Sequence, residues 1–141
     1  MVIAAIQPGG PIRMRTGKNR SKEQLHGFIR ANVADECANI YTDEFQSYTG
    51  IEDANTRHAT VNHSIHEYVR GDVHTNTVES AFSLFKRSVV GAFHQISAKH
   101  IDRYLDEFEW RFNNRKNPYL FRDTLLRLID AKSLPYEKLT A

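Results

Sequence analysis

The sequence Val2-Ile3-Ala4-Ala5-Ile6-Gln7-Pro8-Gly9-Gly10-Pro11-Ile12-Arg13-Met14-Arg15 follows directly after the first methionine. The apolar run Val2–Ile6 predicts a strand, the turn residues 8–11 predict a reversal, and residues 12–15 predict a returning strand. We therefore expect the chain to begin inside a β-sheet, with the following elements packed around this hairpin.

A helix is predicted directly after the hairpin. Ser21 and Gln24 have the spacing of a capping box, in which each side chain satisfies a free backbone N–H of the first turn. Apolar residues then recur at helical spacing, at Leu25, Phe28, Ile29 and Val33. This apolar face is expected to pack on the sheet.

Strands and further helices follow. Residues 38–42 and 58–62 predict two strands, and Asp43 stands at the end of the first. A second capping box, Asn76 with Glu79, predicts a helix that ends near Gly91. Ser97 is expected to cap a third helix, and a last amphipathic helix carries Leu120, Leu125, Leu128 and Ile129. The order indicates an α/β fold with helices crowding the C-terminal half.

Composition sets outer limits. The 141 residues suit one domain, and 40% hydrophobic with 26% charged residues is typical of a globular chain. One cysteine, Cys37, excludes an internal disulfide and fits a reducing cytoplasm. The apolar run Val2–Ile6 is too short for a signal peptide or a membrane span. A cytoplasmic protein without membrane contact is expected.

Charge is concentrated near the N-terminus. The net charge is only +2, but residues 13–30 contain six basic residues against the single acid Glu23. The basic residues are Arg13, Arg15, Lys18, Arg20, Lys22 and Arg30. They bind nucleic acid if the fold gathers them into a patch, and otherwise form a solvated face.

Three residues have the chemistry of a phosphoryl-transfer site. Asp43 follows a predicted strand, Glu79 lies in the first turn of a predicted helix, and Lys86 comes about two turns later on the same helix face. Carboxylates in such positions bind Mg²⁺ or Mn²⁺, and two such ions can activate a nucleophile at a phosphodiester. Each residue also has an ordinary explanation: Asp43 as a turn residue, Glu79 as a capping partner and Lys86 as solvated surface.

Longer stretches resemble the ISXO-like transposase domain of insertion sequences, a DDE-type family of the ribonuclease H-like superfamily. The matching stretches are Tyr41-Thr42-Asp43-Glu44 with Tyr48, residues 66–80 (HEYVRGDVHTNTVES), residues 83–87, Lys99-His100, residues 104–108, residues 111–113 and residues 21–33. The resemblance therefore covers nearly the whole chain before about Asn117.

The resemblance implies a ribonuclease H-like mixed sheet with flanking helices and a catalytic set of Asp, Asp and Glu. Asp43 would be the second acid and Glu79 the third, both holding Mg²⁺ or Mn²⁺. Lys86 would contact DNA near the cleaved end, and Asn76 and His74 are lesser candidates of the same motif. Further DNA contacts are expected from Arg87, Arg13, Arg15 and Arg20. The implied partners are transposon ends and target DNA, with a second copy or a full-length transposase.

One departure from the family pattern matters. The first Asp of the family lies on a strand before the opening hairpin, and no aspartate precedes Asp35 here. We therefore expect an N-terminally truncated domain, with its first strand missing and a sheet edge exposed. Residues 1–117 would form a partial catalytic domain, residues 118–141 a helical tail, and the chain alone would be inactive.

Two other functions remain open from the residues alone. His58, His63, His66 and His74 with Asp72 could form a histidine-metal nuclease, since imidazole and carboxylate suit transition metals. The basic residues 13–30, beside the aromatic residues 104–112, could instead belong to a module that binds DNA or another transposase without catalysis. The aromatic spacing is also that of an ordinary core face.

Overall fold

The computed structural model describes residues 1–34, 39–43, 46–52, 56–61, 69–70, 73–74, 76–133 and 135–137. In these ranges the strands are β1 (Val2–Ile6), β2 (Ile12–Thr16), β3 (Asn39–Asp43), β4 (Arg57–Val61), β5 (Val69–Arg70) and β6 (Val73–His74). The α-helices are α1 (Lys22–Asn32), α2 (Asn76–Ser88), α3 (Ile101–Asn113) and α4 (Leu120–Asp130). The α/β class and the helical C-terminal half are confirmed.

The strands form three separate pairs within the described part of the chain. β1 and β2 are antiparallel, β3 and β4 are parallel, and the short β5 and β6 are antiparallel. The sequence had predicted one mixed sheet. The hairpin and the β3–β4 pair both contribute to a core around α1, but no backbone pairing joins β1 to β3.

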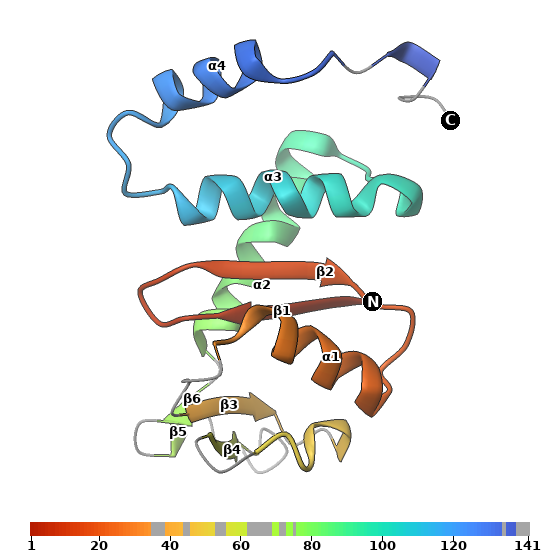
Figure 1. Ribbon diagram of the computed structural model, residues 1–141, viewed down its shortest axis with the longest axis vertical. Coiled ribbons are helices and arrows are strands. Elements are labelled where there is room, and N and C mark those ends of the chain that lie inside the picture. Colours follow the sequence, from red (N-terminus) through yellow and green to blue (C-terminus); the bar gives the residue numbers. More distant parts are fainter. Residues whose placement is uncertain are drawn as a thin grey trace.

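The hairpin is covered on both faces (Figure 1). One face places Ile3 against Leu25, Phe28 and Ile29 of α1. The other places Ile12 and Met14 against Ala81 and Phe85 of α2 and Leu105 of α3. Successive strand residues point to opposite faces, so a strand covered on both sides is apolar throughout, as the run Val2–Ile6 is.

Helix α3 also covers the free edge of β2. The outward N–H groups of Ile12, Met14 and Thr16 donate to the side chains of Asn113, Glu109 and Asp102 in turn. Two strand residues span about 6.8 Å and four helix residues rise about 6 Å, so the step from Asn113 to Glu109 on the antiparallel helix matches the step from Ile12 to Met14. Asp102 lies seven residues before Glu109, near the start of α3, and reaches Thr16 at the end of the strand. The side chains of α3 thus take the place of a neighbouring strand.

The ends of the helices follow the sequence in part. Ser21 caps α1 by accepting from the Gln24 N–H at 3.4 Å, as predicted. Gln24 does not return a bond to Ser21, and its Oε1 instead accepts from Lys18 and Asn19. Gly91 does not end α2, because a π-helical turn over Val89–Phe93 continues to His94, whose φ is 58°.

Layers succeed one another along the long axis of the molecule. Figure 1 shows α4 outermost, then α3, the hairpin, α1 and the β3–β4 pair. Among the described residues, no helix has the length and apolarity that crossing a bilayer requires. The candidate acids lie at the end of β3 and in the first turn of α2.

Candidate functional site

Asp43 is the last residue of β3, and its side chain is exposed. Thr42 before it is buried, and its hydroxyl donates to the Asp43 carbonyl oxygen at 2.8 Å. Because a hydroxyl has one proton, Thr42 Oγ1 must accept at its second contact, the His58 Nε2 atom 2.8 Å away. This bond ties β4 to β3 directly beneath the candidate acid.

His58 lies between Thr42 and Glu52. Burial lowers the pKa of its imidazole, Glu52 opposes that effect, and His26 lowers the pKa further. Its Nδ1 lies 3.7 Å from the Glu52 carboxylate. Both ring nitrogens therefore have neighbours, and His58 serves the structure of the strand pair.

Asp43 and Arg20 both act on the Tyr48 phenol. Burial raises the pKa of the Tyr48 phenol, the Asp43 carboxylate raises it further, and Arg20 lowers it. The Tyr48 phenol therefore has an acidic and a basic neighbour, and the basic one, Arg20, is a residue that the sequence had assigned to DNA contact. Arg20 and Tyr48 lie on distant segments of the chain, so no spacing in the sequence revealed this grouping.

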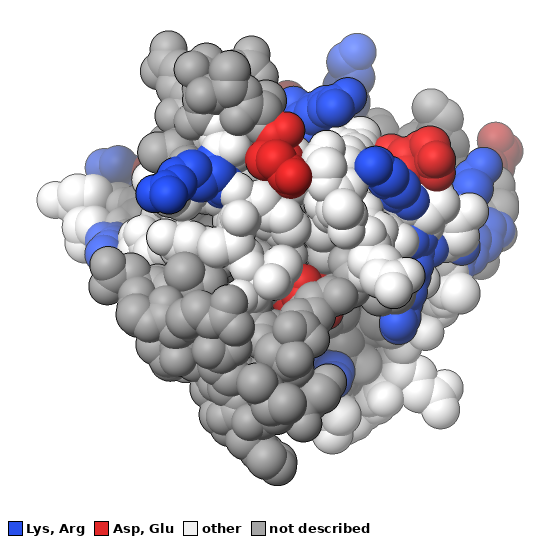
Figure 2. Space-filling view, turned by 90° about the horizontal axis from the view of Figure 1, so that it is seen from below, with Lys and Arg blue, Asp and Glu red and all other residues white. Residues whose placement is uncertain are grey.

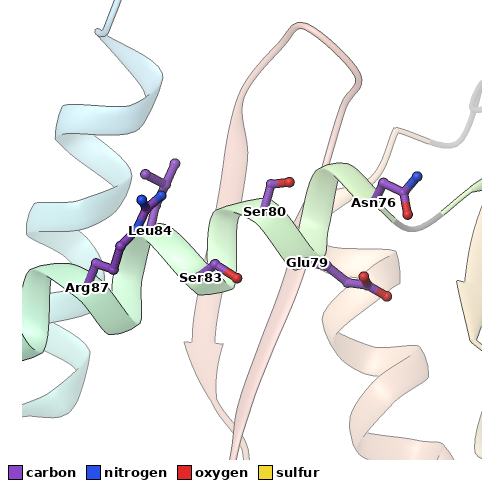
Figure 3. A pocket seen from close by; sticks show the side chains of 6 residues that line it. All are labelled: Asn76, Glu79, Ser80, Ser83, Leu84 and Arg87. Atoms are coloured by element: carbon purple, nitrogen blue, oxygen red, sulfur yellow. The ribbon is translucent and has the colours of Figure 1, made fainter.

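Glu79 lies in the first turn of α2, exposed, in a shallow pocket of about 400 Å³. The residues that line this pocket are Asn76, Glu79, Ser80, Ser83, Leu84 and Arg87. Figure 3 shows Asn76 and Glu79 at one end of this stretch of helix and Arg87 at the other. The pocket contains a carboxylate, an amide, two hydroxyls and a guanidinium, which suits a polar, anionic ligand together with a hard cation.

The pocket includes one of the two basic residues of α2 that were predicted to contact DNA. Lys86 is exposed but does not line this pocket, and Arg87 does. Ser80 and Ser83 were not predicted, although the polar residues Asn76, Ser80, Ser83 and Arg87 recur at helical spacing. That repeat was a usable signal, because it marks a helix face as polar just as an apolar repeat marks a core.

Asp43 is not among the residues that line the Glu79 pocket. The two acids lie on elements that β6 connects, since β6 contacts both β3 and β4 and is followed closely by α2. A pocket shared by the two carboxylates is thus still a prediction.

The basic residues of the hairpin are engaged by α3. Arg15 contacts Glu109 and Asp106, each at 3.0 Å, and Arg13 lies 3.7 Å from Glu109. Figure 2 shows one face of the molecule, on which basic side chains are interspersed with acidic and uncharged surface. The N-terminal arginines are therefore partly neutralised, and their assignment to DNA contact stays a prediction.

Several predicted residues lie outside the described part of the chain. Asp35, His63, His66 and Asp72 are not described, nor is the side chain of His74. Among the residues that are described, no group of three or more His, Cys, Asp or Glu side chains could hold a metal ion. Of the proposed histidine-metal set, only the side chain of His58 is described, and it contacts Thr42 and Glu52.

Comparison with known proteins defines the class. Residues 1–113 match the family described as "ISXO2-like transposase domain". The chain therefore belongs to this transposase family, as the resemblance had predicted. The match includes both candidate acids and ends at α3, so α4 lies outside it.

Two curated relatives agree with this assignment. An "Uncharacterized transposase-like protein" of Haemophilus influenzae is 35% identical over 96 residues, which are 68% of this chain and 76% of that protein. An "Uncharacterized protein in transposable element ISH50" of Halobacterium salinarum is 40% identical over 96 residues, 64% of this chain and 32% of that protein. The chain thus spans about a third of the second relative. No solved structure gives a significant match.

Proposed function

We propose that this chain supplies Asp43 and Glu79 to the metal-dependent phosphodiester cleavage and strand transfer of an insertion-sequence transposase. The observation that carries the proposal is the family match over residues 1–113, which includes both acids. In support, both carboxylates are exposed, one at the end of a parallel strand pair and one in a polar pocket on α2.

The donor atoms of these residues fit Mg²⁺ or Mn²⁺. Hard divalent ions prefer carboxylate, amide and hydroxyl oxygens, and Glu79 lies beside the Asn76 amide and the Ser80 hydroxyl. Asp43 and Glu79 would hold the ion, with Asn76 as a further oxygen donor. A bound ion supplies activation of the attacking hydroxyl and stabilisation of the leaving oxygen.

The remaining pocket residues are suited to the DNA backbone. Arginine, serine and asparagine side chains are among the groups that donate hydrogen bonds to phosphate oxygens. Arg87 and Ser83 lie along α2 from Glu79, so a strand that follows the helix meets its phosphates there while one phosphodiester lies at the acid. Lys86, which directly precedes Arg87 on α2, is exposed and adds positive charge.

Two acids account for part of the Asp, Asp and Glu set that the family resemblance implies. No residue of this chain is assigned as the third carboxylate. We therefore expect the isolated 141-residue chain to leave DNA uncut. Robust Mg²⁺-dependent nicking by this chain would contradict that statement.

The direct test is binding of Mn²⁺ to the purified chain, measured by the enhancement of water proton relaxation. Asp43→Asn and Glu79→Gln are each expected to weaken Mn²⁺ binding at least about tenfold, because each removes a charged oxygen donor. Glu107→Gln is the matched control, since Glu107 is a solvent-accessible acid on α3 paired with Arg111. Equal Mn²⁺ affinity in all four proteins would refute the proposal.

The alternative, a module that binds DNA without catalysis, gives a different result. Such a module retains a duplex with steep salt dependence, in Asp43→Asn and Glu79→Gln as in the parent chain, with or without divalent ions. The ion pairs of Arg13 and Arg15 with α3 do not favour it, because they leave less free charge for phosphates. The metal-dependent function is thus the better supported.

A further inference from the structure

Helix α4 exposes an apolar face. Of its eleven residues none is buried. Five large apolar side chains are exposed over 44% to 78% of their surface: Phe121, Leu125, Leu126, Leu128 and Ile129. Exposed apolar residues in one contiguous group mark an interaction surface, whereas scattered ones do not.

The side of α4 that meets α3 is a different one. Thr124 Oγ1 accepts from the Trp110 Nε1–H at 3.4 Å, and the Arg127 guanidinium lies 4.1 Å from the Trp110 ring centre. Thr124 and Arg127 are three residues apart and share a face, while Leu125, Leu126 and Ile129 lie on the side of the helix turned away from it. Figure 1 accordingly shows α4 at the outer edge of the molecule, with α3 on one side.

A helix of this length needs a covering surface. Isolated helices shorter than about 12–15 residues are marginal in water, and most helix stability in proteins comes from packing of the apolar face. The contact with Trp110 buries none of the five apolar side chains fully. An additional partner for this face is therefore expected.

We propose that this partner is α4 of a second copy of the chain, packed antiparallel. The helix carries Arg122 and Arg127 against Asp123 and Asp130, so its charges cancel and self-association meets no net repulsion. A helix that lies on anionic lipid or along DNA is typically basic, which this one is not. The neutral, apolar face suits an identical helix.

The order of charges selects the antiparallel arrangement. Arg122 is the third residue of α4 and Asp130 the last, eight residues apart. Two copies related by a twofold axis near Leu126 place Arg122 of each beside Asp130 of the other. A parallel pair would set like charges side by side. The present pair of Arg122 with Asp123 is exposed, so it is exchanged at little cost.

The dimer is expected to be weak. An interface centred on one helix from each copy is smaller than the roughly 800 Å² per partner of a standard stable interface. Dissociation constants near the micromolar level follow, with the family domain of residues 1–113 unaffected. This inference is independent of the proposed metal site, because Asp43 and Glu79 take no part in it.

Sedimentation velocity of the 141-residue chain across a roughly hundredfold concentration range tests the proposal. Concentration-dependent dimers are expected. Ile129→Glu should raise the dissociation constant more than about tenfold, because a charge replaces an apolar side chain that the dimer buries. Val90→Glu is the control, since Val90 is equally exposed but lies on the π-helical turn before α3. Circular dichroism checks that both variants fold.

Charge exchange tests the antiparallel order. Asp130→Arg alone should weaken the dimer by placing it beside Arg122, and the double variant Arg122→Asp with Asp130→Arg should restore it. A merely structural loss would not be restored by the second change. A chain that is monomeric at every concentration, or dimers that Ile129→Glu leaves intact, would overturn the proposal.

Discussion

Glu109 joins α3 to the edge of β2. Its side chain is 9% exposed, accepts from the Met14 N–H, and contacts Arg15 at 3.0 Å and Arg13 at 3.7 Å. The aromatic residues at helical spacing over 104–112 predict a buried helix face, but they do not predict that an acid, Glu109, belongs to that face. Apolar spacing shows which side of a helix is buried, but it does not show that a polar residue on that side meets a strand edge.

Replacing Glu109 by alanine should destabilise the protein by about 1–3 kcal/mol, because the Met14 N–H is left buried without an acceptor. Urea unfolding followed by circular dichroism measures the change. Glu107→Ala is the comparison on the same helix, since its pair with Arg111 at 2.7 Å is largely exposed and contributes less than about 0.5 kcal/mol. Equal losses in the two variants would show that Glu109 does not seal the strand edge.

The candidate acids illustrate what a motif predicts and what it does not. Asp43 and Glu79 were chosen from their order and spacing, and the structure places both at exposed ends of regular elements. Tyr48 belongs to the same motif as Asp43, but the effect of Arg20 on Tyr48 was not predictable, because it depends on tertiary packing. Residue types indicate chemistry, whereas the surroundings that adjust it depend on the whole fold.

Among the elements, starts were more predictable than ends. Ser21 caps α1 as expected. Ser97 was expected to cap the third helix, but it accepts the Lys99 N–H in the three-residue turn Ala98–His100 before α3, and α3 itself has no side-chain cap. Capping depends on a local bond over two or three residues, so sequence shows it directly. Gly91 was expected to end α2, yet the chain continues through a π-helical turn, since a glycine permits an end without requiring one.

The two capping serines should differ in importance. Ser21→Ala removes the cap of an eleven-residue helix that forms one core, so a loss of about 0.5–2 kcal/mol is expected. Ser97→Ala removes a cap from the three-residue turn Ala98–His100, where the loss should be less than half as large. Thermal unfolding of the two variants compares them. A larger effect at Ser97 would mean that this turn, and not α1, limits stability.

At the scale of the whole molecule, the hairpin is the shared wall of two cores. Ile3 belongs to the cluster around α1, and Ile12 and Met14 belong to the cluster with α2 and α3. The sequence predicted the hairpin and its apolar strands, but not that the described strands divide into three pairs. Strand pairing between distant segments leaves no periodic signal, and neither does the partner of an amphipathic helix such as α4.

Because both cores share the hairpin, they should unfold together. Ile29→Val thins the core around α1 and Ile12→Val thins the other, each by one buried methylene and about 0.5–1.5 kcal/mol. Trp110, the single tryptophan, reports on α3 by fluorescence, while circular dichroism reports on all helices. In both variants the two probes should give one common urea midpoint, shifted downward. If Ile29→Val lowered only the circular dichroism midpoint and left Trp110 unchanged, the α1 core would be a separate cooperative unit, and the hairpin would not couple α1 to α3.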